Sequence, residues 1–462
     1  MPRLSSLAQQ FHLELHSESD PEISEVAITA QFVKPAALFI AVAGAKHHGL
    51  DFLDQAIGSG AVALLTDRAG DYELPTLVHP NPREIAGELA AAVYGTEASE
   101  LFAVTGTNGK TSTSYFLRRL LIAAGRPAGL ISSAEQIIGE QVQSAELTTP
   151  EAPRLHQLLY QMRAAGESSC ALEVSAQALV RNRVDGLGFV VSGFTNLSRD
   201  HLDDFGTMEN YLAAKAELFK PGRSQLTVIN IEDSWGQQLF DLVDIPKLSL
   251  GPGCDYDYSF DGELLSISGA QQLVIKFGGT ALMAKNLALA AVMLLAAGID
   301  VPNGSEVEHE VPGRLQLVSS KRPHVYVDYA HTPAGVAAAV AELRGQYPQL
   351  TVVLGASGNR DRGKRAEMAL AAAPADLLVI TDQHPRDEDP AEIRSQLVAA
   401  AKDSGIEYIE VPDPAEAIAR AVAATGPEGA ILWCGPGHLK YREIAGKKVA
   451  FDAIAIAQGE LL

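Results

Sequence analysis

The chain has 462 residues, which exceeds the size at which a single hydrophobic core keeps growing, so we expect three domains. Its residues are 47% hydrophobic and 20% charged, which is typical of a folded, water-soluble protein. The formal net charge of -21 argues against broad binding of nucleic acids, because such binding needs a basic surface that neutralises phosphates. Any anionic ligand must therefore be bound by local cations and backbone N–H groups.

Neither the amino-terminal residues nor the longest apolar stretch indicates export or membrane insertion. Residues 1–20 lack the basic start and the continuous apolar run of a secretory signal. The stretch 281–299 is rich in alanine and leucine, but Lys285 and Asn286 interrupt it, so it predicts a buried helix. The three cysteines are isolated and form no Cys-x-x-Cys pair for zinc or redox chemistry. We therefore expect a cytoplasmic protein without a membrane span.

Short strands rich in β-branched residues alternate with alanine-rich helices along the chain. This alternation predicts α/β units on mainly parallel sheets. The clearest expected elements, in chain order, are strands over 61–65 and 101–104, helices over 112–124, 211–219 and 286–297, and strands over 325–327, 350–354 and 377–380. A proline and a glycine at 312–313 suit a linker before the last group of elements.

The segment 105–111, Thr-Gly-Thr-Asn-Gly-Lys-Thr, lies between an expected strand and an expected helix. In that position the loop N–H groups and the helix N-terminus bind phosphate, Lys110 adds a positive charge, and Thr111 offers a hydroxyl to Mg²⁺. The general pattern Gly-x-x-x-x-Gly-Lys-[Ser/Thr] requires glycine at position 104, where the chain has Val104. A glycine-containing turn before a helix is the alternative interpretation. The flanking strand and helix favour nucleotide binding.

Together with other motifs, this segment resembles the Mur ligases, which are ATP-dependent ligases that build the peptide stem of bacterial peptidoglycan. These enzymes carry the shortened loop Gly-Thr-Asn-Gly-Lys-Thr, which stands here at 106–111. Within the family, the chain is most similar to UDP-N-acetylmuramoyl-tripeptide synthetases of the actinobacterial type. The segments that carry this similarity are 148–151, 173–175, 196–203, 214–215, 313–314 and 328–333.

The resemblance implies an α/β fold of three domains. An N-terminal domain over 1–97 would bind the UDP part of the substrate, and a central P-loop ATPase domain would span 98–311. A C-terminal, Rossmann-like domain over 312–462 would bind the incoming amino acid. The implied reaction phosphorylates the D-glutamate carboxylate of UDP-N-acetylmuramoyl-L-alanyl-D-glutamate with ATP, and an amine then attacks the acyl phosphate. Because two anions must approach each other, cations and Mg²⁺ have to offset their repulsion.

The resemblance also implies the residues that manage the metal and the chemistry. The implied catalytic residues are Lys110, Glu173, His201 and Lys215, with Thr111, Glu173, His201 and Lys215 as metal-binding residues. Lys215 is implied to be N6-carboxylated, that is, a carbamylated lysine. Considered singly, Glu173 suits a salt bridge at a strand end, His201 a structural hydrogen bond, and Lys215 a solvated helix surface.

Three sets of binding residues follow from the same resemblance. ATP is expected to contact Gly106, Thr107, Asn108, Gly109, Lys110, Thr111, Ser112, Asn286, Arg314, Asp328 and His331. The muramoyl-dipeptide is expected to contact Thr148, Thr149, Ser175 and Arg183, whose hydroxyl and guanidinium groups suit carboxylates. The amino acid is expected to contact Arg360, His384, Arg386 and Gly435.

The identity of the added amino acid depends on departures from the family pattern. Ligases that add meso-diaminopimelate carry Asp-Asn-Pro-Arg where this chain has Gln-His-Pro-Arg at 383–386. The family's Gly-Lys-Gly-His-Glu becomes Gly-Pro-Gly-His-Leu at 435–439, so Leu439 replaces the glutamate that would receive the distal ammonium. An unpaired ammonium there costs about 1–3 kcal/mol. Ala-Gln at 176–177 also replaces the usual Ser-His.

These departures favour L-lysine or L-ornithine over meso-diaminopimelate. A basic side chain still needs an anionic partner, for which the sequence offers three candidates: Asp387, Glu388 and Asp389. A neutral amino acid is the remaining alternative.

The N-terminal region departs from the family as well. Thr-Ala-Gln at 29–31 replaces Asp-Ser-Arg, so Ala30 stands in place of a serine that helps to bind the uridine diphosphate. Lys46, His47 and His48 either supply a substitute contact to phosphate or form a solvated turn.

Two alternative functions stay open at this stage. One is a Mur-like ligase redirected to another carboxylate, and the other is a catalytically inactive nucleotide-binding scaffold. The joint presence of Lys110, Glu173, His201 and Lys215 argues against the scaffold, since binding alone needs no metal apparatus. We expect a monomer that uses ATP, Mg²⁺, the UDP-muramoyl-dipeptide and a free amino acid, and that has no nucleic-acid partner.

Overall fold

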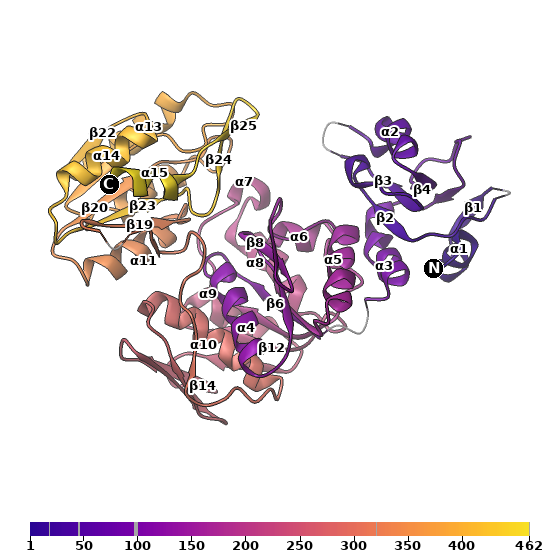
Figure 1. Ribbon diagram of the computed structural model, residues 1–462, viewed down its shortest axis with the longest axis horizontal. Coiled ribbons are helices and arrows are strands. Elements are labelled where there is room, and N and C mark those ends of the chain that lie inside the picture. Colours follow the sequence, from indigo (N-terminus) through magenta and orange to yellow (C-terminus); the bar gives the residue numbers. More distant parts are fainter. Residues whose placement is uncertain (18, 45–46, 97–99, 320, 462) are drawn as a thin grey trace.

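The computed structural model describes residues 1–462 except 18, 45–46, 97–99, 320 and 462. Three bodies lie in a row, with the N-terminal one at one end and the C-terminal one at the other (Figure 1). They are built on sheets of five, twelve and six strands, and a separate two-stranded hairpin lies near the C-terminus. Among the described residues, no helix combines the length and the apolar character needed to cross a membrane.

The first sheet has the strand order β1-β5-β4-β3-β2, and only β1 is antiparallel to its neighbour. Side chains alternate between its two faces, so Leu38 and Ile40 pack on one side of β3 and Phe39 on the other. The elements are α1 (Leu4–Gln10), β1 (Glu14–His16), β2 (Glu25–Ala27), η1 (Ala30–Phe32), β3 (Ala37–Ala41), η2 (Gly49–Phe52), α2 (Leu53–Gly58), β4 (Ala61–Thr66), β5 (Thr76–Val78) and α3 (Pro82–Tyr94).

One of the candidate phosphate-binding residues in this domain serves the local fold instead. The ring of His48 is buried, its Nε2 lies 3.0 Å from Asp67 Oδ1, and its Nδ1 accepts a hydrogen bond from the N–H of Leu50. Both ring nitrogens are therefore engaged within the domain. The side chain of His47 is exposed and lies 3.7 Å from Asp51, whereas Lys46 lies outside the described residues.

A buried histidine joins the first and second bodies. His156 on α5 (Ala152–Ala164) is fully buried, its Nδ1 lies 2.5 Å from Thr96 Oγ1, and its Nε2 lies 3.2 Å from the carbonyl oxygen of Asp185. Burial lowers the pKa of His156 to about 4, against an ordinary value of 6.5. The imidazole is therefore neutral at pH 7, with Nε2–H donating to Asp185 and Nδ1 accepting from Thr96.

This histidine makes stability depend on pH. Between pH 6.5 and pH 4 the unfolded chain protonates His156 and the folded chain does not, so stability is lost as pH falls through this window. The loss between pH 7 and pH 5 is roughly 2 kcal/mol. We expect His156→Gln to lower the melting temperature at pH 7 but to show a smaller further fall at pH 5 than the parent chain. Thermal unfolding followed by circular dichroism at both pH values measures the difference; equal falls would contradict the assignment.

The second sheet has the strand order β17-β16-β15-β14-β13-β12-β11-β6-β10-β7-β8-β9. Its centre, from β14 to β7, is parallel, and antiparallel pairs extend both edges, except that the last strand, β17, is parallel to β16. The strands are β6 (Glu100–Thr105), β7 (Ala128–Ile131), β8 (Glu135–Ile138), β9 (Gln141–Ser144), β10 (Ser169–Glu173), β11 (Phe189–Phe194), β12 (Ser224–Asn230), β13 (Lys247–Leu250), β14 (Tyr256–Phe260), β15 (Leu264–Gly269), β16 (Leu273–Lys276) and β17 (Ser305–Glu306).

Helices cover both faces of this sheet because its central strands are apolar on both sides. Phe102 and Val104 of β6 pack toward α4 and α10, whereas Leu101 and Ala103 pack toward α5 and α8. The helical elements are α4 (Lys110–Ala123), α5, α6 (Ala176–Val180), α7 (Leu202–Phe205), α8 (Met208–Ala216), η3 (Glu217–Phe219), α9 (Ser234–Leu242) and α10 (Ala281–Ala296). The buried helix expected within 281–299 is confirmed as α10, whose side chains from 286 to 295 are all buried.

The third sheet has the strand order β18-β19-β23-β20-β21-β22, and only β18 is antiparallel. The expected strands over 350–354 and 377–380 are confirmed as β20 and β21 with the same bounds. The elements are β18 (Gln316–Leu317), β19 (His324–Asp328), α11 (Pro333–Arg344), β20 (Leu350–Leu354), α12 (Lys364–Ala371), β21 (Leu377–Ile380), α13 (Pro390–Asp403), β22 (Tyr408–Glu410), α14 (Pro414–Ala424), β23 (Ala430–Cys434), β24 (Tyr441–Ile444), β25 (Lys447–Ala450) and α15 (Ala453–Glu460).

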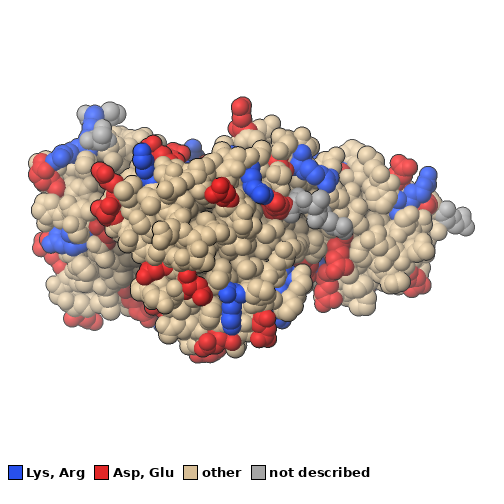
Figure 2. All heavy atoms as spheres, turned by 90° about the horizontal axis from the view of Figure 1, so that it is seen from below, with Lys and Arg blue, Asp and Glu red and all other residues tan. Residues whose placement is uncertain are grey.

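The surface charge agrees with the composition. On the face drawn in Figure 2, acidic side chains are spread over all three bodies, and the basic side chains do not form a continuous stripe. A nucleic acid would need such a stripe to neutralise successive phosphates.

Candidate active site

A cavity of about 800 Å³ lies where the second and third bodies meet. It collects all the site residues expected from the sequence except Gly106 and Thr149. The expected residues that line it are Thr107, Asn108, Gly109, Lys110, Thr111, Ser112, Thr148, Glu173, Ser175, Arg183, His201, Lys215, Asn286, Arg314, Asp328, His331, Arg360, His384, Arg386 and Gly435. The fold thus brings together side chains that are up to about 330 positions apart in the sequence.

The phosphate loop connects β6 to α4 and depends on two glycines. Gly106 and Gly109 have φ values of +145° and +85°, a region that other residues rarely adopt. A Cβ atom would lie 1.9 Å from Thr195 Oγ1 at Gly106 and 2.2 Å from Asn286 Oδ1 at Gly109. Helix α4 begins at Lys110, two residues earlier than expected from the sequence, because Gly109 occupies the left-handed position before it. Its N-terminus therefore faces the cavity, where its free N–H groups favour an anion.

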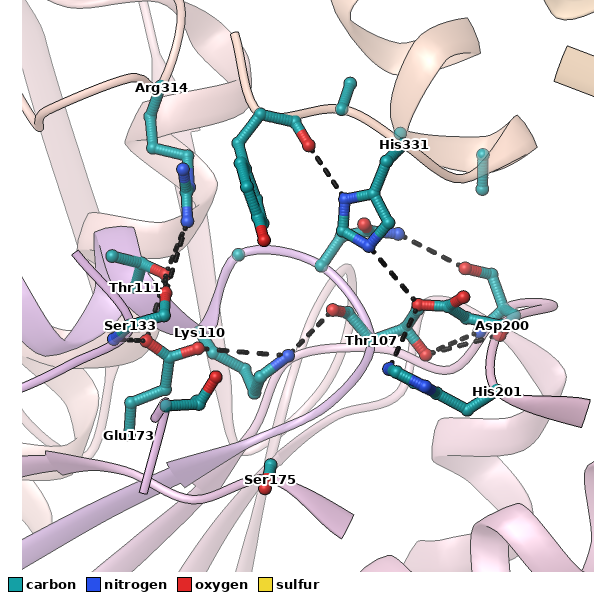
Figure 3. Close-up of a pocket in the computed structure, with 18 of the residues that line it drawn as sticks. Thr107, Lys110, Thr111, Ser133, Glu173, Ser175, Asp200, His201, Arg314 and His331 are labelled. Carbon is teal, nitrogen blue, oxygen red and sulfur yellow. Dashed lines mark hydrogen bonds and ion pairs between the residues drawn. The ribbon is translucent and has the colours of Figure 1, made fainter. Parts of the chain in front are cut away.

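The side chains beside this loop form a compact polar cluster (Figure 3). Thr111 Oγ1 donates to Glu173 Oε2 at 3.0 Å, and the N–H of Ser133 donates to the same oxygen at 2.8 Å. Arg314, which follows the linker, donates to Thr111 Oγ1 at 2.9 Å. Lys110 Nζ lies 2.9 Å from the carbonyl oxygen of Thr107 and 4.0 Å from Glu173 Oε1. Burial lowers the pKa of Lys110, although Glu173 opposes that shift.

Lys215 is buried and does not lie on a solvated helix surface. Its Nζ donates to the carbonyl oxygen of Gly106 at 2.6 Å and lies 4.4 Å from the centre of the Tyr211 ring. Burial lowers the pKa of Lys215 well below its ordinary value, and the charge of Lys110 acts in the same direction. A lysine that is surrounded in this way stands directly behind the phosphate loop.

His201 belongs to a second cluster, centred on Asp200. Asp200 is buried and lies 3.4 Å from His201 and 3.5 Å from His331 (Figure 3). Lys364 Nζ lies 2.8 Å from Asp200 Oδ1. Burial alone would raise the pKa of Asp200, but the hydrogen bond from His331 and the neighbouring positive charges keep it well below its ordinary value. Burial lowers the pKa of His201 to about 4, so its imidazole is neutral at pH 7. Its Nδ1 is buried and has no hydrogen-bond partner among the described residues.

The residues expected to bind the muramoyl-dipeptide flank Glu173. Arg183 forms an ion pair with Glu151 at 2.9 Å and donates to the carbonyl oxygen of Thr149 at 3.3 Å. Thr149 is buried, donates to the carbonyl oxygen of Glu173 and accepts from the N–H of Ser175, which explains why its hydroxyl does not face the cavity. Ser175 accepts from the N–H of Ala178 at the start of α6.

Three carboxylates proposed from the sequence as partners for a basic amino acid do not line the cavity, so that hypothesis is corrected. Asp387 accepts from Asn359, Glu388 pairs with Arg365, and Asp389 caps helix α13. The cavity instead contains Glu443, whose Oε2 lies 3.0 Å from Arg386 Nε.

Several residues of the site were not assigned from the sequence. Ser133, Asp200, Lys364 and Glu443 all line the cavity. Asp200 lies inside the segment 196–203 that carried the resemblance, so the sequence offered a reason to assign it to the site. The other three sit in segments without a motif, and only the tertiary fold brings them to the site.

The arrangement fits a nucleoside triphosphate and Mg²⁺. Among the described residues, no group of three or more His, Cys, Asp and Glu side chains could hold a metal ion. Mg²⁺ does not require such a group, because it keeps several waters and binds through one or two carboxylates together with phosphates. Glu173 and Thr111 supply oxygen atoms beside the helix N-terminus, and His201, whose buried Nδ1 has no hydrogen-bond partner among the described residues, also lines the cavity.

Comparisons with known proteins agree with this geometry. Three family models match in sequence: the Mur ligase catalytic domain over 22–100, the Mur ligase middle domain over 104–250, and the glutamate ligase domain of Mur ligases over 313–437. A UDP-N-acetylmuramyl-tripeptide synthetase from Leifsonia xyli is 41% identical, over 97% of this chain and 94% of its own. A UDP-N-acetylmuramoyl-L-alanyl-D-glutamate–2,6-diaminopimelate ligase from Streptomyces avermitilis is 38% identical, over 94% and 92%.

A solved structure shares the architecture. A MurF ligase from Thermotoga maritima in complex with ADP superposes with a TM-score of 0.68 at 18% identity, covering 95% of this chain and 96% of the other. The family models matched and the named relatives define an ATP-dependent ligase of the acid–amino-acid type. The chain belongs to the Mur ligase family. The resemblance and the fold class inferred from the sequence are therefore confirmed.

Proposed function

We propose that this ligase adds L-lysine or L-ornithine to the D-glutamate carboxylate of UDP-N-acetylmuramoyl-L-alanyl-D-glutamate in peptidoglycan synthesis. The observation that carries the proposal is the single cavity that joins the phosphate loop, the Glu173 cluster and Arg386. A nucleotide, an acceptor carboxylate and an amino acid can all meet there. We further propose that residues 1–97, 98–311 and 312–462 serve UDP binding, ATP use and amino-acid binding, in that order.

Nucleotide binding would rest on the N-terminus of α4 and on cations from two domains. Lys110 and the loop from Thr107 to Ser112 line the cavity and would face the triphosphate, Gly106 would contribute through the turn that precedes them, and Arg314 approaches the same place from the third domain. Further contacts would come from Asn286, Asp328 and His331, which line the cavity. Mg²⁺, when bound, supplies charge neutralisation between the triphosphate and the acceptor carboxylate. Thr111, Glu173, His201 and a carbamylated Lys215 would hold it.

The acceptor peptide would lie beside Glu173. Thr148, Ser175 and Arg183 line that part of the cavity, and Thr149 orients the turn by bonding both Glu173 and Ser175. Arg183 forms an ion pair with Glu151, which would fix its guanidinium while leaving other N–H donors for a carboxylate.

The amino acid would enter at the third domain. Arg386, Arg360, His384 and Gly435 line this end, and a guanidinium there suits the carboxylate of an incoming amino acid. Leu439 lines the same end and cannot accept a hydrogen bond from a distal ammonium. We also propose that the protein is a cytoplasmic monomer.

A panel of amino acids tests the proposal directly. ADP release is measured with ATP, Mg²⁺ and UDP-muramoyl-L-alanyl-D-glutamate, with one amino acid added at a time. We expect release only when acceptor and amino acid are both present, and the highest kcat/KM with L-lysine or L-ornithine. A strong preference for meso-diaminopimelate would refute the choice of amino acid. Release with another carboxylate acceptor would point to a redirected ligase, and nucleotide binding without turnover to a scaffold.

A further inference from the structure

The hairpin β24–β25 is attached to the loop that carries Arg386. The N–H of Arg386 donates to the carbonyl oxygen of Glu443 at 3.0 Å, and the N–H of Glu443 donates to His384 Nδ1 at 3.0 Å. Arg442 Nε donates to the carbonyl oxygen of Gln383 at 2.7 Å. These three bonds fix one edge of the hairpin against residues 383–386, so the side chain of Glu443 has a defined position.

The side chain of Glu443 lines the cavity, and its carboxylate makes fewer hydrogen bonds than it can accept. Its Oε2 lies 3.0 Å from Arg386 Nε. Its Oε1 receives no hydrogen bond from any described residue, and 39% of the side chain is exposed. Arg386 also donates to the carbonyl oxygen of Gly358, which leaves part of its guanidinium free. A carboxylate oxygen and guanidinium donors are therefore available side by side.

No other carboxylate competes for this role at the third-domain end of the cavity. Among the described residues that line it, Glu443 is the only Asp or Glu after Asp328 in the chain. Asp382, which lies next to the loop, is engaged by Arg394 and Arg442. An ammonium group in this region therefore has one carboxylate to approach.

The neighbours of Glu443 also suit a diamino acid. Burial, with the charge of Arg386, lowers the pKa of His384 to about 4, so this histidine is neutral at pH 7 and does not repel an ammonium. Leu439 and Tyr441 line the cavity close by in sequence and offer apolar surface to a methylene chain. A wall of this kind accommodates the aliphatic part of lysine or ornithine.

We propose that Glu443 is the specificity-determining residue that binds the side-chain ammonium of the incoming amino acid, next to an Arg386 that binds a carboxylate. The inference rests on the proposed function and names the group that selects its substrate. Glu443 would thereby supply, from the hairpin, the negative charge that Leu439 lacks. The competing explanation is that Glu443 only neutralises Arg386 and fastens the hairpin.

The two explanations predict different effects on the ratio of kcat/KM for L-lysine to kcat/KM for L-norleucine. L-norleucine keeps the aliphatic chain of L-lysine but has no ammonium, so kcat/KM is measured for both amino acids by ADP release. We expect the parent enzyme to prefer L-lysine by at least about 100-fold, and Glu443→Gln to reduce that ratio by about 10- to 100-fold. Asp387→Asn is the matched control, because it also changes a carboxylate to an amide but at a nearby residue that does not itself line the cavity. Its ratio should equal that of the parent.

Every other outcome counts against the inference. An unchanged ratio in Glu443→Gln, or an equal loss with both amino acids, shows that Glu443 has only a structural role. A parent enzyme that uses L-norleucine as well as L-lysine overturns the inference but leaves the ligase function intact. If no amino acid elicits ADP release from the parent enzyme, the proposed function fails and the inference fails with it.

Discussion

Substitution of Lys215 by alanine is expected to lower kcat by roughly 10³-fold or more, which corresponds to about 4 kcal/mol of transition-state stabilisation. The amine lies 2.6 Å from the carbonyl oxygen of Gly106, directly behind the phosphate loop. If the ammonium first loses one proton, its nitrogen can bond to the carbon of CO₂ and lose a second proton, so that the cation becomes a carbamate anion, which would hold Mg²⁺. Alanine removes both the proposed metal-binding group and the contact with Gly106. Steady-state ADP release measures the loss.

Two comparisons separate carbamylation from a simple loss of fold. Lys220→Ala changes an exposed lysine nearby that pairs with Glu217, and it should keep parental activity. Parent enzyme depleted of CO₂ should regain activity when bicarbonate is added, whereas Lys215→Ala should not. Retention of ADP binding by Lys215→Ala would show that the phosphate loop persists. An active Lys215→Ala enzyme would refute the proposal that Lys215 is a carbamylated residue that holds Mg²⁺.

The sequence predicts the fold well where burial determines it. The strand at 350–354, Leu-Thr-Val-Val-Leu, is apolar except for Thr351, and it is fully buried in the structure. Element ends are less predictable, because Gly109 lets α4 begin at Lys110, and that conformation is not visible in an apolar pattern. The helix expected over 211–219 is really α8 followed by a 3₁₀ turn at Glu217–Phe219.

Some residues of the site can be recognised from the local sequence, whereas others are brought to the site only by the tertiary fold. Lys110 is recognisable because it ends a phosphate-loop motif and begins the helix after β6, and Glu173 because it ends β10 at the carboxyl edge of a parallel sheet, where ligands bind. Lys215 looks like a surface residue from its helical spacing, and only packing against Tyr211 and Gly106 buries it. Glu443 belongs to a short hairpin with no motif. Its relation to Arg386 depends on contacts across 57 positions of sequence.

A set of ion pairs joins the second and third domains, and we expect its disruption to lower activity strongly. We define the interdomain latch as Arg199 and Asp200 together with Asp361, Lys364 and Glu367. Arg199 contacts Asp361 at 2.9 Å and Glu367 at 2.7 Å, and Lys364 contacts Asp200 at 2.8 Å. Lys364 and Asp200 are both buried, so their attraction is only weakly screened by solvent. These contacts exist only while the two domains are together.

Lys364→Met is expected to lower kcat by roughly 100-fold. Removing one partner of a buried ion pair costs about 3–5 kcal/mol, because the other charge stays buried with less compensation. The cost falls on the closed arrangement alone, since Asp200 regains water when the domains separate. The closed population should therefore fall, and the cavity should open, which would admit water to the proposed acyl phosphate. Small-angle X-ray scattering should show a larger radius of gyration.

Because Lys364 also lines the cavity, its effect on activity could arise from a direct ligand contact. Arg199 does not line the cavity, so Arg199→Ala acts only through the latch and should lower kcat about 10-fold while enlarging the particle. Arg362→Met is the control, because Arg362 is exposed and pairs with Glu388 of its own domain. Loss of activity in Lys364→Met without a change in particle size, combined with full activity in Arg199→Ala, would show that Lys364 works by touching substrate. A parallel loss of activity and compactness in both variants would show that charge pairs hold the domains together for catalysis.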